Sequence, residues 1–171
     1  VPIFKMLIPK TKEKILKAFF FNPSVSLYVR EVARKTRVST QNAHKYLKSL
    51  NEIGFLIKTS EHNQVFYKPN LDNPFLVKFF ELFEIERREA VRIKKKKLRS
   101  KIIKLQEQKS VYCDFGLFMG DKTIIVSAKE RSGTWSHKKF QEKLNDPNFF
   151  NELMKKRVVV FGEAKFWEFI K

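Results

Sequence analysis

Apolar residues recur with helical spacing near the start of the chain. Four of them, Ile15, Leu16, Phe19 and Phe20, fall at positions i, i+1, i+4 and i+5, so they share one face of a helix. Thr11 is a suitable N-terminal cap for this helix, and the sequence Asn-Pro-Ser that follows Phe21 ends it. The pattern predicts one amphipathic helix between these two signals.

Two further helices are predicted in the next thirty residues. The first spans residues 27–36, and a short turn, Thr-Arg-Val, leads to Ser39, which is a good N-cap. The second helix runs from there to Ile53, where Gly54 supplies its C-terminal stop. Its inward positions, spaced by four and three residues, are Ala43, Leu47 and Leu50. The two helices and their turn form a helix-turn-helix pattern.

Two short strand patterns follow these helices. Residues 55–58 and 65–68 carry apolar and β-branched side chains, and the polar segment 60–64 separates them, which predicts a β-hairpin. The order helix, helix, turn, helix, hairpin is that of a winged helix-turn-helix. We therefore expect residues 1–70 to form a winged helix domain.

The stretch VSTQNAHKYLKSLNEIGFL, residues 38–56, resembles archaeal and bacterial winged helix-turn-helix transcriptional regulators of the MarR/ArsR type. That family commonly shows Val-Ser, polar residues, a small or branched apolar residue, Leu-x-x-Leu, then Gly and two apolar residues. The matching positions are Val38, Ser39, Ala43, Leu47, Leu50, Gly54, Phe55 and Leu56. Arg37 stands where the family often has Gly. The resemblance covers about residues 10–70 and implies a DNA-binding regulator, not an enzyme.

The outer side of the third helix carries polar side chains that can enter a major groove. Gln and Asn can make paired hydrogen bonds to adenine, while Lys binds phosphate or guanine. The residues expected to contact double-stranded DNA from this helix are Ser39, Thr40, Gln41, Asn42, His44, Lys45 and Lys48. Flanking contacts to the DNA backbone are expected from Arg30, Arg34, Lys35 and Arg37, and from Lys58, His62 and Lys68 of the hairpin. The alternatives are a merely solvated helix face and a module that binds protein or RNA.

The charge of the chain favours a polyanionic partner. Its net charge is +18, with thirteen basic and four acidic side chains in the first seventy residues. Such an excess is typical of proteins that bind nucleic acid or an anionic membrane. No apolar run approaches the ~18 residues of a membrane span, Cys113 is the single cysteine, and the three histidines lack metal-ligand spacing. We expect a cytoplasmic protein with no metal, no cofactor and no membrane contact.

A long helix is predicted over residues 74–108, because Pro74 suits a first helical position and no Gly follows until Gly116. Its apolar residues keep a heptad-like spacing whose phase shifts near residue 98. Pairing of two copies would cover them, and the residues expected at this dimer interface are Leu76, Phe79, Phe83, Ala90, Ile93, Leu98, Ile102 and Leu105. The alternative is packing of this stripe against the chain's own winged helix.

The same predicted helix carries a run of basic residues. The run is Lys94, Lys95, Lys96 and Lys97, followed by Arg99, Lys101 and Lys104. It is either a phosphate-binding strip or a solvated face, and the sequence favours neither.

The last sixty residues predict a small α+β lobe. Residues 111–119 and 123–129 alternate like half-buried strands around Gly120-Asp121, a hairpin turn. Ser136 and Asp146 are suitable N-caps for two helices, residues 158–161 form a buried strand, and a last helix follows Gly162. The fold class is therefore α+β, in three parts: a winged helix domain at 1–70, a long connecting or dimerisation helix at 71–110, and this lobe at 111–171.

The lobe weakly resembles the small nucleotidyltransferase-like domain of some archaeal winged-helix proteins. Residues 113–117, Cys-Asp-Phe-Gly-Leu, are similar to its Asp-x-Asp motif with the second Asp lost, and residues 158–167 are similar to its tail. Its Gly-Ser loop has no counterpart, which implies a degenerate, non-catalytic relative. The alternative, a working nucleotidyltransferase, needs a second carboxylate within ~4–5 Å of Asp114 to share a metal. The lobe would otherwise provide dimer contacts, effector sensing through the loop 131–135, or recruitment of transcription machinery.

Overall fold

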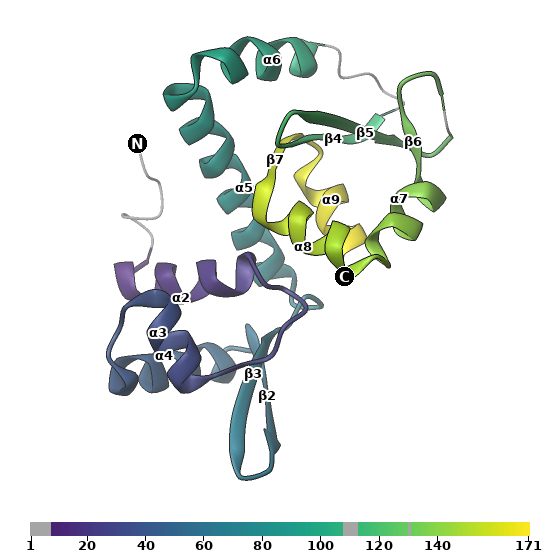
Figure 1. The fold of residues 1–171 in the computed structure, drawn as a ribbon. Helices are drawn as coiled ribbons and strands as arrows, with labels where there is room; N and C mark the ends of the chain where they lie inside the picture. Colours follow the sequence, from purple (N-terminus) through teal and green to yellow (C-terminus); the bar gives the residue numbers. More distant parts are fainter. Residues whose placement is uncertain (1–7, 108–112, 130) are drawn as a thin grey trace. The chain divides into compact units, whose positions relative to one another are not determined.

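Figure 1 shows a computed structural model of the chain, which describes residues 8–107, 113–129 and 131–171. The chain divides into two compact units, Val1–Phe80 and Glu81–Lys171. Of the described part of the predicted middle segment, residues 71–80 fall in the first unit and residues 81–107 in the second.

Three helices form the body of the first unit: α2 (Lys10–Phe20), α3 (Val29–Thr36) and α4 (Thr40–Glu52). α2 buries its four predicted apolar residues, none of them more than 2% exposed. The predicted cap at Thr11 is wrong. Pro9 occupies the N-cap position with φ of −55°, and its carbonyl accepts the N–H of Glu13 at 3.1 Å. Proline fixes φ near this value, so it sets the start of the helix.

A three-stranded antiparallel sheet completes the first unit, with β1 (Leu27–Tyr28), β3 (Gln64–Pro69) and β2 (Leu56–Glu61) in that order. The hairpin is longer than predicted because its turn contains only His62 and Asn63. Both have positive φ, 47° and 61°, as the two central residues of a type I′ turn require. Leu27 and Tyr28 were expected in a helix, and they instead pair with β3. The first unit therefore has the winged helix-turn-helix fold that the sequence predicts.

The next helix, α5 (Pro74–Lys94), begins in the first unit. Asn73 caps it, since its Oδ1 accepts the N–H groups of Phe75 and Leu76 at 3.0 and 3.2 Å. The prediction of one helix to residue 108 is wrong: Lys95 interrupts it, and α6 (Lys96–Glu107) follows. The break lies where the phase of the apolar positions shifts, so each piece can turn its own apolar side inward.

The second unit is built on a four-stranded sheet in the order β6-β5-β4-β7. Its strands are β4 (Cys113–Met119), β5 (Lys122–Ser127), β6 (Trp135–Ser136) and β7 (Arg157–Phe161), and only the β5–β6 pair is parallel among those described. Three helices accompany them: α7 (His137–Leu144), α8 (Pro147–Lys156) and α9 (Glu163–Ile170). The predicted caps Ser136 and Asp146 are confirmed, because each accepts a backbone N–H of the first turn. This unit contains the small α+β lobe that the sequence predicts, with β6 as an unpredicted addition.

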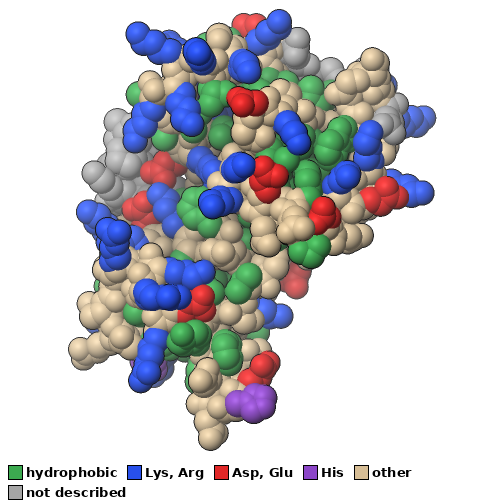
Figure 2. Space-filling model, viewed as in Figure 1, with side chains coloured by type: hydrophobic (Ala, Val, Ile, Leu, Met, Phe, Trp, Pro, Cys, Tyr) green, Lys and Arg blue, Asp and Glu red, His purple; other side chains and the backbone are tan. Residues whose placement is uncertain are grey.

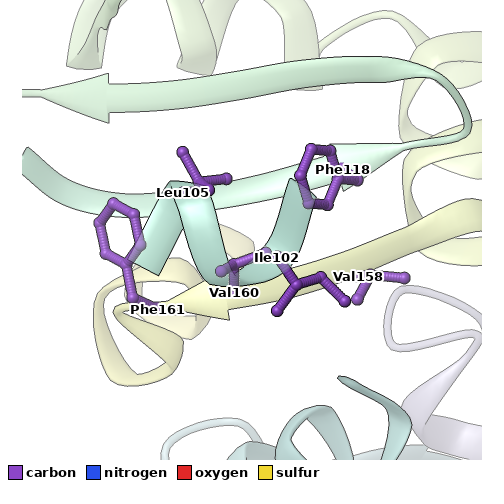
Figure 3. Close-up of a cluster of buried hydrophobic side chains, with 6 residues drawn as sticks. All are labelled: Ile102, Leu105, Phe118, Val158, Val160 and Phe161. Atoms are coloured by element: carbon purple, nitrogen blue, oxygen red, sulfur yellow. The ribbon is translucent and has the colours of Figure 1, made fainter. Parts of the chain in front are cut away.

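α6 packs on this sheet through two residues of its inner side. Ile102 and Leu105 are 0% and 4% exposed and contact side chains of β4 and β7, as Figure 3 shows. The cluster consists of Ile102, Leu105, Phe118, Val158, Val160 and Phe161. Burial of this apolar surface holds α6 against its own sheet.

The eight residues of the predicted dimer interface differ in their exposure. Four of its eight residues are buried within the chain itself, at most 4% exposed: Leu76, Phe83, Ile102 and Leu105. Phe79 packs edge-to-face on Phe55 of the first unit, with 5.6 Å between ring centroids. Leu98 is half-buried, whereas Ala90 and Ile93 are exposed. A continuous apolar seam open to a second copy is therefore absent from this part of the described chain.

A buried ion pair joins α5 to β7 inside the second unit. Arg157 Nε donates to Glu84 Oε1 at 2.5 Å, and both side chains are fully buried. Nearby, Arg88 donates to the Val160 carbonyl at 2.8 Å and forms an ion pair with Glu163. Burial raises the pKa of the Glu84 carboxyl and lowers that of the Arg157 guanidinium, while each charge offsets part of the other's shift.

None of the described helices combines the length and apolar character that crossing a membrane requires.

Candidate nucleic-acid interface

α4 is anchored on one side and open on the other. Ala43, Leu47 and Leu50 are 0%, 0% and 2% exposed, as their spacing predicts. Ser39 caps the helix, and its Oγ accepts the N–H of Asn42 at 3.3 Å. The polar residues of the opposite side are all exposed: Thr40, Gln41, Asn42, His44, Lys45 and Lys48. The helix thus presents hydrogen-bonding side chains to solvent from a packed base.

The turn before α4 is fixed by backbone geometry. Arg37 has φ of 55° and ψ of 47°, the left-handed conformation in which Gly is commonest. The N–H of Val38 bonds the Ala33 carbonyl at 3.1 Å, and Thr36 Oγ1 donates to the Val32 carbonyl at 2.7 Å. These bonds close the end of α3 and set the direction in which α4 begins. A non-Gly residue adopts this conformation at modest cost, and here the Arg37 side chain remains exposed.

The basic residues of α3 add positive charge beside this turn. Arg30, Arg34 and Lys35 are exposed like Arg37. Lys35 lies 3.4 Å from Glu31 of the same helix, and Lys48 of α4 lies 4.0 Å from Glu52. Pairs this exposed contribute little stability, so both lysines can exchange their partner for a phosphate at small cost.

The hairpin places its predicted contact residues on two faces. Lys58 lies opposite Tyr67 in the register, and Lys68 lies opposite Ile57. Directly opposed residues share a face, and neighbouring residues of a strand do not. Lys58 and Lys68 therefore point to opposite faces of the hairpin, so the structure does not bring them together. His62 is exposed at the tip, in the turn itself.

A shallow hollow of about 320 Å³ lies where the start of α3 meets β3. It is lined by Tyr28, Val29, Arg30, Gln64 and Val65. Tyr28 and Gln64 are exposed polar residues beside Arg30 that the sequence did not single out. A two-residue strand leaves no periodic signal, so only the pairing of β1 with β3 brings Tyr28 to this place.

The candidates of the second unit are dispersed, and of them Trp135 lines a cavity of about 590 Å³ together with Asp146, Phe149 and Glu152. Asp114, the residue of the weak nucleotidyltransferase resemblance, has its Oδ2 2.8 Å from Nε2 of His137, and the His137 ring packs against Phe169 at 4.9 Å. Among the described residues no group of three or more His, Cys, Asp or Glu side chains could hold a metal ion. In the loop 131–135, Thr134 Oγ1 lies within hydrogen-bond distance of Ser127 Oγ, at 3.1 Å, and accepts the N–H of Arg131 at 2.9 Å. Cys113 is half-buried next to the α6 cluster.

The fold and the surface of α4 together define the first unit as a winged helix-turn-helix module. No protein-family model and no curated protein sequence matches the chain. Some solved structures are similar to part of the chain. MepR, a transcription regulator of the Staphylococcus aureus multidrug efflux pump MepA, is 11% identical with a TM-score of 0.43, over 62% of this chain and 81% of that chain.

Two further solved structures are similar over a comparable share of the chain. Sso10a-2, a DNA-binding protein from Sulfolobus solfataricus, is 21% identical with a TM-score of 0.37, over 60% of this chain and 99% of that chain. NadR in complex with 4-hydroxyphenylacetate is 20% identical with a TM-score of 0.45, over 63% of this chain and 76% of that chain. Likenesses this distant concern the arrangement of elements, and they assign no ligand or partner to this chain.

Proposed function

We propose that the chain is a sequence-specific, double-stranded DNA-binding transcriptional regulator that inserts α4 into the major groove. The observation that carries this proposal is the division of α4 into two sides. Its apolar residues are at most 2% exposed, whereas Gln41, Asn42 and Lys45 all face solvent. A helix anchored in this way can place its outer side chains against base edges without disturbing the core.

The charge of the first unit supports the same partner. Residues 1–70 carry thirteen basic and four acidic side chains, and the fourteen residues expected to contact DNA are all exposed. Cations around a recognition helix bind phosphates and fix its orientation, while the amides of Gln and Asn select the base. The expected division of labour is base reading by Gln41 and Asn42 and phosphate binding by Lys45 and the α3 cations.

Replacing Gln41 or Asn42 with Ala tests base reading. Each change should reduce the preference for the specific site over a random duplex by about 1–3 kcal/mol, that is about 5- to 150-fold, because a bidentate contact to a base edge is lost. The specific site is first selected from a random duplex library with the full chain, and affinities for the selected and random duplexes are then compared at one salt concentration.

Lys45→Ala is the matched control for this experiment, since Lys45 lies on the same exposed side of α4. It should weaken binding to both duplexes by a similar factor and lower the salt dependence by about one phosphate contact. Equal losses on both duplexes for Gln41→Ala and Asn42→Ala would contradict the base-reading role. Failure of the library to yield any preferred sequence would contradict sequence specificity altogether.

Pairing of two copies, which the sequence predicts, is the second part of the proposal. The four buried residues of the predicted interface are not accessible to a second copy. The large apolar side chains that α5 leaves exposed are Phe75 and Ile93, at 71% and 76%. They lie eighteen residues apart on the helix, so each would have to contact a second copy separately. We expect the full chain to sediment at equilibrium as a dimer and Ile93→Asp to shift it toward the monomer. A monomer at all concentrations would exclude pairing in the absence of DNA.

A further inference from the structure

The end of α5, the break at Lys95 and the outer surface of α6 carry a set of closely spaced cations. We call it the α6 basic strip, and it consists of Lys94, Lys95, Lys96, Lys97, Arg99, Lys101 and Lys104, all of them exposed. No Asp or Glu occurs in the sequence between Glu89 and Glu107. Figure 2 shows Lys and Arg side chains gathered over the region that Figure 1 labels α6.

Some lysines of other helices are paired with carboxylates of the same helix. Lys17 lies 2.6 Å from Glu13 in α2, Lys156 lies 2.8 Å from Glu152 in α8, and Lys165 lies 2.7 Å from Glu168 in α9. Within the described residues, none of the seven cations of the α6 basic strip has such a partner at ion-pair distance. The strip differs from these helices in having seven neighbouring cations and no carboxylate among them.

The arrangement within α6 is unfavourable for the helix on its own. Lys97 and Lys101 are four residues apart, a spacing at which like charges repel on a helix surface. Lys96, Lys97 and Arg99 also lie in the first turn, where the helix dipole is already positive. An external polyanion would relieve both effects at once.

The apolar side of α6 is already packed against its own sheet, which favours a nucleic acid over a membrane as the partner. A helix that lies in a membrane surface inserts a broad apolar face, but Ile102 and Leu105 of α6 are already buried against β4 and β7 (Figure 3). The large apolar side chain that α6 leaves exposed is Ile103, at 38%. What α6 offers to solvent is therefore charge, on a helix that its own sheet holds in place.

The size of the strip suits a duplex. Twelve helical residues extend over roughly 18 Å at 1.5 Å per residue, and a DNA duplex carries one negative charge per ≈ 1.7 Å of its axis. Lysine binds phosphate as a point charge without reading sequence. We propose that the α6 basic strip is a second, sequence-independent site for the phosphate backbone of duplex DNA. This inference shares with the proposed function the class of partner but rests on residues of the other unit.

The test is the salt dependence of binding to a random 40-bp duplex by the full chain. A variant with Lys96, Lys97, Arg99 and Lys101 all changed to Gln should lower the slope of log affinity against log salt by about 3–4, because each lost phosphate contact removes about 0.9. The fall in affinity between 50 and 200 mM salt then becomes about a hundredfold smaller. Gln is a good helix former, so α6 should persist. A charge-conserving variant, with the three lysines changed to Arg and Arg99 changed to Lys, should keep the slope of the parent chain.

A matched control changes to Gln four other exposed lysines of the same unit, Lys129, Lys138, Lys143 and Lys155. An equal change of slope in this control would show that only net charge matters and would overturn the inference. An unchanged slope in the Gln variant would overturn it as well, and so would loss of binding to phosphatidylserine vesicles without any change on DNA. Lys45→Ala separates the two proposals: a normal effect of Lys45→Ala with no effect of the Gln variant leaves the α4 interface standing alone, and the reverse leaves only the α6 basic strip.

Discussion

Replacing Arg157 with Met should lower the free energy of unfolding by about 3–5 kcal/mol, because it strands a buried carboxylate. Arg157 donates to Glu84 Oε1 and to the Met154 carbonyl, both at 2.5 Å, and its guanidinium carbon lies 5.3 Å from the centre of the Trp167 ring. Methionine fills much of the volume but satisfies none of these polar groups. Urea unfolding followed by the fluorescence of Trp135 and Trp167, which both lie in the second unit, measures the loss.

The double variant Glu84→Leu, Arg157→Met tests whether the unpaired carboxylate causes this loss. Buried ion pairs replaced as a whole by apolar residues are often neutral or stabilising, whereas removal of one partner is costly. The double variant should therefore recover most of the stability that the single variant loses. A single variant as stable as the parent would show that the Glu84 carboxyl finds water or another partner when Arg157 is absent.

Gly162→Ala should destabilise the second unit by about 2–5 kcal/mol, from backbone strain and overpacking together. Gly162 has φ of +73°, and a Cβ built there lies 2.0 Å from the carbonyl oxygen of Asp114 and 2.7 Å from the Cα of Phe115. These are backbone atoms, so the neighbouring strand itself would have to move. Urea unfolding followed by tryptophan fluorescence measures this loss of stability as well.

Gly133→Ala is the control that separates the two contributions to this loss. Its φ is +79°, but nothing lies within 4 Å of the added Cβ, so it should show only the cost of the left-handed conformation, about 1–2 kcal/mol. If both variants lose the same free energy of unfolding, the close approach of Gly162 to β4 contributes nothing to the loss. A larger loss at Gly162 gives the cost of displacing that strand.

The winged helix could be predicted because its signals are local. The spacing of Ala43, Leu47 and Leu50, the cap at Ser39 and the stop at Gly54 each specify backbone within one or two turns of helix. The strand β1 could not be predicted, since two residues carry no periodicity and the strand exists only through its pairing with β3. The exposure of the candidate DNA contacts follows from the helix pattern, whereas their arrangement across the hairpin depends on a register set by the His62-Asn63 turn.

The second unit was harder to predict because its organising contacts are distant in sequence. α5 contains several carboxylates, and its sequence alone does not show that Glu84 is the one in the core, paired with a residue 73 positions away. The continuous helix failed for a related reason. Local propensity does not oppose a helix through Lys95, and the interruption lies where Ile102 and Leu105 turn toward a sheet formed by later residues.

The helix α6 makes the second unit respond in two opposite ways to its ionic surroundings. Dissolved electrolyte screens exposed charges beyond about 10 Å at 0.1 M, so it eases the mutual repulsion of the lysines and favours the folded helix. At the proposed α6 site the same electrolyte would compete with phosphates for those lysines and release a bound duplex. If α6 binds DNA as proposed, the conditions that most stabilise this helix are those in which it binds the duplex most weakly.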